Sequence, residues 1–123
     1  MSGENIKTAD VYFDAINKHD LAALSKVISP VVHFSSPIGD SHDRDSFLAI
    51  IEKMFPLLKE VHVRARFASD NRVFCLYDMI FNPPLGRTPT ANMMTFVEGK
   101  IKMIEVIYDA RPFESFVAQK MNV

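Results

Sequence analysis

The chain has 123 residues, a size that supports one hydrophobic core, so we expect a single domain spanning residues 1–123. Hydrophobic residues make up 48% of the sequence and the formal net charge is −1, which excludes a disordered chain and offers no basic surface for nucleic acid. The sequence has no apolar run of the roughly 18 residues that a membrane helix needs, no secretory signal at residues 1–10, and a single cysteine, Cys75. We therefore expect a cytoplasmic protein that does not bind membranes and has no internal disulfide.

Two helices are predicted in the first thirty residues. Apolar side chains recur at helical spacing from Glu4 to Lys18, and they cover enough of the helix to bury it on more than one side. His19 interrupts this pattern, and Asp20 is placed to cap a second, shorter helix. Pro30 ends that helix, because the residue before a proline is disfavoured in helical conformation.

A strand, a loop and a third helix are expected next. Residues 31–36 predict a short strand, and residues 37–43 predict a loop. Asp43 or Asp45 then caps the third helix. Pro56 should kink or stop this helix after Phe55, because proline lacks the backbone donor that a helix interior requires.

The segment from Val61 to Asp109 predicts a sheet of consecutive antiparallel strands. The predicted strands cover residues 61–68, 72–81, 88–97 and 100–109. Asp70–Asn71 and Glu98–Gly99 are typical of tight hairpin turns, whereas the prolines and glycine of residues 82–87 cannot continue a central ladder.

Helices first and strands afterwards predict an α+β fold, because alternating βαβ units are absent from the pattern. The apolar face of so long a sheet must be covered, and only the amino-terminal half has the helices to cover it. We expect a strongly curved antiparallel or mixed sheet wrapped around three amino-terminal helices and enclosing an apolar pocket.

Three segments together resemble a known family. They are YFDAINKHDLAALSKVIS, VVHFSSPIGD and GKIKMIEVIYDARPF. Their order and spacing are similar to the SnoaL-like and ketosteroid-isomerase-like branch of the nuclear-transport-factor-2-like superfamily, and the resemblance extends from about Thr8 to Phe113. It implies a cone-shaped (cystatin-like) fold with a deep apolar pocket, and frequently a homodimer across the outer face of the sheet. Members include isomerases, polyketide cyclases, hydrolases, dehydratases and non-catalytic domains, so the fold alone does not decide the activity.

The resemblance also implies three functional positions. A ketosteroid isomerase has a tyrosine on the first helix, a general base before the proline of the first strand's turn, and a protonated aspartic acid on the third strand of the meander. These positions hold Tyr12, Ser36 and Met94 in this chain. Serine has no basic form at neutral pH and a thioether cannot donate a hydrogen bond, so we do not expect steroid isomerisation by the usual residue set.

Asp78 is the one charged side chain in the otherwise apolar run from Val73 to Phe81. If Asp70–Asn71 is a two-residue loop, Phe67 faces Phe74, Ala65 faces Leu76 and Val63 faces Asp78. Asp78 would then share a face with Phe74, Leu76 and Ile80, and would be either an acid or base in the pocket or a structural partner of an arginine.

The resemblance implies the opposite parity, with Cys75, Tyr77, Met79 and Phe81 in the pocket and Asp78 outside it. A slip of one residue reverses every assignment, so both alternatives remain open at this stage.

Other groups are weaker candidates for chemistry. His33 on the first strand can serve as an acid or base near neutral pH or simply hydrogen-bond to a neighbour. Tyr12 and Tyr108 are expected to offer hydroxyls to a carbonyl or to form part of the pocket wall. Asp109 and Arg111 are expected to form an ion pair at the rim.

No cofactor is expected, and no metal. The four histidines show no ligand spacing such as HExxH, a single cysteine cannot form a site, and the four glycines form no phosphate-binding loop. Cys75 is expected to be a buried, inert thiol.

The predicted function is binding of a small, mostly hydrophobic ligand in the apolar pocket. One alternative is a cofactor-independent isomerase, cyclase or hydrolase that transfers protons on a carbonyl compound, with Tyr12, Asp78 and His33 as candidate catalytic residues. A second is a non-catalytic domain for dimerisation or partner binding. The residues expected to line the pocket are Phe13, Ile16, Phe34, Ser36, Met54, Phe55, Met79, Met94, Phe96, Val106 and Tyr108.

Overall fold

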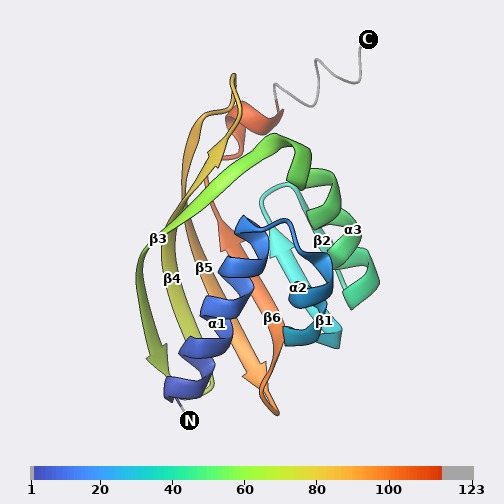
Figure 1. The fold of residues 1–123 in the computed structure, drawn as a ribbon, viewed down its shortest axis with the longest axis vertical. Helices are drawn as coiled ribbons and strands as arrows, with labels where there is room; N and C mark the ends of the chain where they lie inside the picture. Colours follow the sequence, from blue (N-terminus) through green and yellow to red (C-terminus); the bar gives the residue numbers. More distant parts are fainter. Residues whose placement is uncertain (1, 115–123) are drawn as a thin grey trace.

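The computed structural model describes residues 2–114, in which helices cover one face of a curved sheet (Figure 1). The helices are α1 (Ser2–Asn17), α2 (Leu21–Val27) and α3 (Arg44–Met54), and a 3₁₀ turn (Phe55–Leu57) follows α3. The strands are β1 (Ile28–Ser36), β2 (Gly39–Ser41), β3 (Leu58–Ser69), β4 (Arg72–Phe81), β5 (Arg87–Val97) and β6 (Lys100–Ile107). The predicted α+β class, with helices preceding the main sheet, is confirmed.

The six strands form one mixed sheet in the order β2-β1-β6-β5-β4-β3. Only the β1–β6 pair is parallel, and every other neighbouring pair is antiparallel. The ladders of β1–β6, β3–β4 and β5–β6 each contain an irregularity of register, and bulges of this kind increase the local bend and twist of a sheet. The sheet therefore curves around α1 without closing into a barrel (Figure 1).

Local signals in the sequence set the helix boundaries. The carboxylate of Asp20 accepts a hydrogen bond from the backbone N–H of Ala23 at 3.0 Å, as an N-cap should. Of the two aspartates considered for α3, Asp43 is the N-cap, with its carboxylate 2.7 Å from the backbone nitrogen of Ser46. Pro56 lies in the 3₁₀ turn directly after α3, so the predicted stop is confirmed.

The predicted loop at residues 37–43 contains a strand that the sequence did not indicate. β2 is only three residues long and pairs with the end of β1, with Phe34 opposite Ser41 and Ser36 opposite Gly39. β1 also begins at Ile28, two residues before Pro30, and so is longer than predicted. The presence of β2 and the early start of β1 have one cause. Pairing of β1 with β6 and β2 imposes extended structure on residues whose sequence lacks the alternation of apolar and polar side chains typical of a strand.

The predicted register of β3 and β4 is right near the turn and wrong beyond it. Phe67 lies opposite Phe74 and Ala65 opposite Leu76, as the two-residue loop requires. The register then shifts between Val63 and Ala65, so His62 and not Val63 lies opposite Asp78. A bulge at Arg64 is the physical reason, because its extra residue moves every later pair by one.

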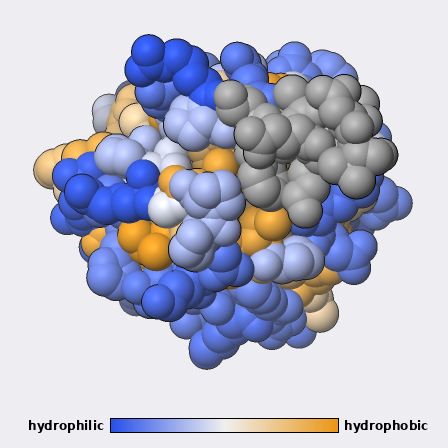
Figure 2. All heavy atoms as spheres, turned by 90° about the horizontal axis from the view of Figure 1, so that it is seen from above, coloured by the Kyte–Doolittle hydropathy of each residue, from blue (hydrophilic) through white to orange (hydrophobic). Residues whose placement is uncertain are grey.

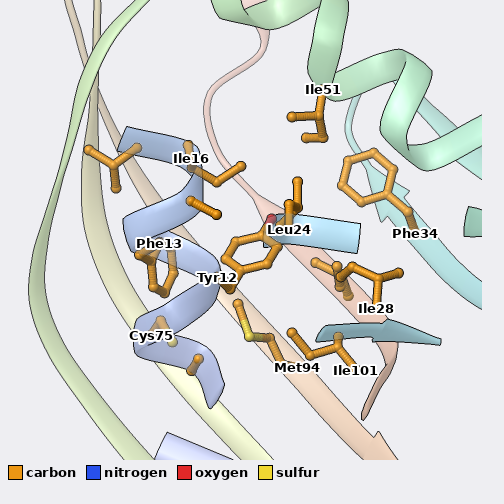
Figure 3. Close-up of a cluster of buried hydrophobic side chains, with 14 of the residues drawn as sticks. Tyr12, Phe13, Ile16, Leu24, Ile28, Phe34, Ile51, Cys75, Met94 and Ile101 are labelled. Atoms are coloured by element: carbon orange, nitrogen blue, oxygen red, sulfur yellow. The ribbon is translucent and has the colours of Figure 1, made fainter. Parts of the chain in front are cut away.

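The core lies between α1, α2, α3 and the inner face of the sheet. Figure 3 shows Tyr12 at its centre, extending from α1 between Leu24, Phe34 and Met94, with Phe13 on the same helix. Positions 9, 12, 13 and 16 recur at helical spacing and are all buried, which confirms the apolar stripe predicted for this helix. Within residues 2–114, no helix combines the length and the apolar character needed to cross a bilayer.

The segment after β6 folds back against the cavity end of the molecule. In its described part, the backbone N–H groups of Phe113 and Glu114 donate to the carbonyl of Ala110 in a short turn. The ring of Phe113 packs against Phe81 and Tyr108, with centroid distances of 5.1 and 5.3 Å. Residues 115–123 lie outside the described part of the chain.

Candidate functional site: a cavity under the curved sheet

A cavity of about 430 Å³ opens between α1, α3, the β1–β2 hairpin, β4, β6 and the turn that carries Phe113. Its lining is mostly apolar and consists of Tyr12, Phe34, Ser36, Ile38, Gly39, Asp40, Ile50, Ile51, Lys53, Met54, Leu57, Tyr77, Met79, Phe81, Val106, Tyr108 and Phe113. Figure 2 views the molecule from above, the end at which the described part of the C-terminal segment lies, and hydrophobic side chains are visible there between hydrophilic ones. Cavities of this size accommodate small organic molecules.

The residues predicted to line a pocket fall into two groups. Those that border the cavity are Tyr12, Phe34, Ser36, Met54, Met79, Val106 and Tyr108. Those that belong to the core without bordering the cavity are Phe13, Ile16, Phe55, Met94 and Phe96. Members of the second group point inward as expected, but other side chains fill the space around them.

All three tyrosines of the sequence border the cavity. Tyr12 comes from α1, Tyr77 from β4, and Tyr108 directly follows β6. Burial raises the pKa of Tyr12 and that of Tyr77 well above the usual value, and it also raises the pKa of Tyr108. All three hydroxyls are therefore neutral hydrogen-bonding groups at physiological pH.

Asn92 orients one of these hydroxyls. Its side-chain nitrogen donates a hydrogen bond to the Tyr77 oxygen at 3.2 Å, and both side chains are buried. Because this bond occupies a lone pair of the oxygen, the hydroxyl proton of Tyr77 remains available to another acceptor. The side-chain oxygen of Asn92 has no partner among the described residues.

Asn92 was not among the predicted site residues, and Tyr77 was expected in the pocket only under the parity that the resemblance implies. On β5 the inward polar position is Asn92, two residues before the fully buried Met94 that the family resemblance had indicated. Positions 88, 90 and 92 of β5 are polar and buried. Their alternation is visible in the sequence, but it identifies site residues only when it is known that this face of the strand points inward.

Asp78 does not reach the cavity. Cys75, Tyr77, Met79 and Phe81 are buried on the inner face of β4, so Asp78 lies on the opposite face. There its two carboxylate oxygens lie 3.3 Å from a guanidinium nitrogen of Arg64 and 3.1 Å from one of Arg87. The contact with Arg87 is a hydrogen bond, whereas the contact with Arg64 is an ion pair without hydrogen-bond geometry. Of the two alternatives left open, the structural aspartate is the one observed.

The charged residues at the cavity lie near its mouth. Asp40 and Lys53 both border it, and the Asp40 side chain is exposed. Asp40 lies opposite Ser35 in the hairpin, so the pleat directs it to the face opposite Phe34 and Ser36. The predicted Asp109–Arg111 ion pair is present at 2.7 Å, and the arginine's hydrogen bonds lower the pKa of Asp109 to about 2.

His33 also lies on the face that points away from the cavity. Its ring stacks on that of His42 with a centroid distance of 4.5 Å, and its Nε2 is buried without a partner among the described residues. Cys75 is a buried free thiol, and burial raises its pKa to about 11. The thiolate is therefore scarce at neutral pH, so this cysteine is not an activated nucleophile.

The chain was compared with protein families and with solved structures. Residues 9–104 match the SnoaL-like domain. An NTF2-like protein of unknown function from Cytophaga hutchinsonii is 21% identical, with a TM-score of 0.80 over 89% of this chain and 94% of that one. A proposed polyketide cyclase from Xanthomonas campestris pv. campestris is 15% identical, with a TM-score of 0.76 over 93% and 96% of the two chains.

A proposed ketosteroid isomerase from Kribbella flavida is 13% identical, with a TM-score of 0.80 over 88% of this chain and 79% of that one. At these identities the structural likeness establishes the fold and not the activity. No curated protein matches the chain. The family match covers most of the sequence and agrees with the observed fold, so the chain belongs to the SnoaL-like family.

Proposed function

We propose that this protein binds a small, mostly apolar molecule carrying a carbonyl or similar acceptor oxygen, in the cavity beneath the curved sheet. The observation that carries the proposal is the Tyr77–Asn92 pair, which presents a neutral hydroxyl proton to a mostly apolar cavity. A buried donor without an acceptor costs free energy, and a ligand oxygen would remove that cost.

The chemistry of the walls supports the same class of ligand. Met54, Met79 and Phe81 supply apolar surface, and methionine side chains adapt to ligands of different shape. The polar groups are few, as is typical of sites in which apolar contact provides affinity and one or two hydrogen bonds provide orientation.

Binding is favoured over proton transfer because the required base is not in place. Proton abstraction needs a carboxylate or imidazole within about 3 Å of the substrate proton. Asp78 and His33 lie on the face of the sheet away from the cavity, and the carboxylate of Asp40 is directed to that face too. The tyrosines cannot act as the base, because their pKa values are raised.

The test is the affinity of the purified protein for 2-acetylnaphthalene and for 2-ethylnaphthalene, measured by calorimetry. The two compounds have similar shape, and only the first has a carbonyl oxygen. We expect Tyr77→Phe to weaken binding of the ketone about three- to tenfold, the value of one hydrogen bond, and to leave the hydrocarbon unaffected.

Equal losses for both compounds would show that the substitution acts through packing and would contradict the assigned donor. If neither compound binds the wild-type protein, and mass spectrometry detects no small molecule released from it, the cavity is not a ligand site of this kind. The thermal unfolding midpoint of Tyr77→Phe is the control for correct folding.

A further inference from the structure

A second group of chemically active side chains lies on the β1–β2 hairpin, on the face away from the cavity. In the hairpin ladder, Phe34 lies opposite Ser41 and Ser35 opposite Asp40. His42 directly follows β2, and its ring stacks on that of His33. Because side chains alternate along a strand, His33, Asp40 and His42 share one face. The sequence does not suggest this grouping, since the spacing from 33 to 40 and 42 becomes a cluster only when the chain reverses at residues 37–38.

The geometry of the three groups is that of a loose metal-ligand set. One ligand atom from each of His33, Asp40 and His42 lies within 4.8 Å of the other two. In a tetrahedral site with metal–ligand bonds of about 2.0–2.2 Å, ligand atoms are roughly 3.3 Å apart. The difference is about 1.5 Å at most, and Asp40 and His42 are exposed, so rotation of their side chains can close it.

One of the three groups already lacks a partner. The Nε2 atom of His33 is buried and makes no hydrogen bond with any described residue. A buried polar atom without a partner is uncommon in a folded protein and costs free energy. A group from outside the chain that coordinates the imidazoles would remove part of that cost.

We propose that His33, Asp40 and His42 bind a divalent transition-metal ion of the zinc class. Two imidazoles and one carboxylate are the donors that Zn²⁺ and Co²⁺ accept, whereas Mg²⁺ and Ca²⁺ prefer oxygen ligands throughout. Three protein ligands on an exposed face leave coordination positions for water. The ion would join the second half of β1 to β2 and to the residue that follows it, and so hold the hairpin closed.

The site has a structural consequence for the cavity. The opposite face of the same hairpin contributes Phe34, Ser36 and Ile38 to the cavity wall. An ion that fixes the hairpin would reduce the motion of this wall. The metal site does not depend on the proposed ligand, however, and its test is independent of it.

The experiment uses the full chain without an affinity tag, treated with a chelator and then titrated with Zn²⁺ by calorimetry. We expect one Zn²⁺ per chain, a thermal midpoint that rises with Zn²⁺, and little binding of Mg²⁺. Replacement of the ion by Co²⁺ should give the visible absorption of a site with nitrogen ligands.

Two substitutions remove ligands, and one is a matched control. His42→Ala and Asp40→Asn change exposed side chains, so both variants should fold, and each should weaken Zn²⁺ binding by about tenfold or more. His62→Ala removes another exposed histidine, one that pairs with Glu60 at 3.4 Å, and should leave binding unchanged.

The proposal is overturned if the wild-type protein binds no stoichiometric Zn²⁺. It is equally overturned if His62→Ala lowers the affinity as much as His42→Ala does, because binding would then be a general property of surface histidines.

Discussion

At the scale of single residues, Asp78 shows how burial and charge combine outside the cavity. Its side chain is only 8% exposed, and Arg64 and Arg87, its two partners, come from the neighbouring strands β3 and β5. The carboxylate therefore ties three strands together on the outer face. The side chains of Arg64 and Arg87 are 43% and 58% exposed, so water can solvate their charges when a substitution removes the carboxylate.

We expect Asp78→Asn to lower the free energy of unfolding by about 1.5–3 kcal/mol, the range for hydrogen bonds to charged groups. It should not change ligand affinity or its pH dependence, because the carboxylate does not face the cavity. Urea unfolding and ligand titration across pH check the two parts. A shifted pH profile in the variant would contradict the outward placement.

The raised pKa values of the three tyrosines predict how the stability of the protein changes at alkaline pH. Their pKa values are raised from 10.0 chiefly by burial, so the folded protein keeps protons that the unfolded chain loses. Stability is therefore undiminished below pH 10 and falls as pH rises above that value. In an alkaline titration, tyrosinate absorbance should appear together with the loss of circular dichroism. If most of the absorbance appears while the native spectrum persists, the hydroxyls are not desolvated in solution.

At the scale of elements, Asn17 joins the end of α1 to β3. Its side-chain nitrogen donates to the carbonyl of Val61 at 3.1 Å, and its oxygen accepts from the Val61 N–H at 2.6 Å. The amide thus occupies both backbone groups of one strand residue, close to the bulge at Arg64 where the ladder is irregular. This contact fixes the position of α1, and hence of Tyr12, against the curved sheet.

We expect Asn17→Ala to destabilise the protein by about 1–3 kcal/mol, because two backbone groups lose their partner. Asn5→Ala is the matched control, since it makes the same change in the same helix, and no hydrogen bond of the Asn5 side chain is found among the described residues. Chemical denaturation compares the two variants. Equal stability of both would show that water replaces the Asn17 contacts without cost.

At the scale of the whole molecule, the outer face of the sheet carries exposed apolar side chains. Four of them lie on β3, β4 and β6, in rows that β-pairing makes neighbours: Phe67, Phe74, Leu76 and Ile107, which are 69%, 42%, 41% and 70% exposed. A contiguous apolar surface of this kind is typical of an interface. We propose that a second copy of the chain covers it in a homodimer, the assembly that the family resemblance implied.

Sedimentation of the wild-type protein should therefore give a dimer, and Leu76→Glu should give a monomer, because a charge at the centre of the face opposes burial. Val11→Glu is the control, as it places the same charge at an exposed apolar position on α1, away from the sheet. A wild-type monomer at high concentration, or a dimer unaffected by Leu76→Glu, would contradict this assembly.

Local rules explain which parts of the fold could be predicted. Asp20, Asp43 and Pro56 each act within one helical turn, so the sequence placed the start of α2 and the end of α3 and narrowed the cap of α3 to Asp43 or Asp45. The turn at Glu98–Gly99 was equally predictable, because both residues adopt positive φ, as a two-residue hairpin turn requires. The family resemblance, carried by the order of such elements, was sufficient for the architecture.

The candidate site was predictable only in part. Tyr12, Ser36, Met79 and Tyr108, which were expected at a pocket, border the cavity. Tyr77 and Asn92 were not selected, because both depend on which face of a strand points inward. In a strand that is apolar on both sides, alternation does not reveal that face.

The sequence by itself determined every helix and strand except β2, together with their order and the family, because caps, turns and apolar periods act over a few residues. The tertiary structure alone decided the bulge at Arg64, the outward face of Asp78, and the approach of His33 to Asp40 and His42. The physical reason is that pairing between distant strands sets register and face, and one extra residue in a strand changes which residues meet beyond it.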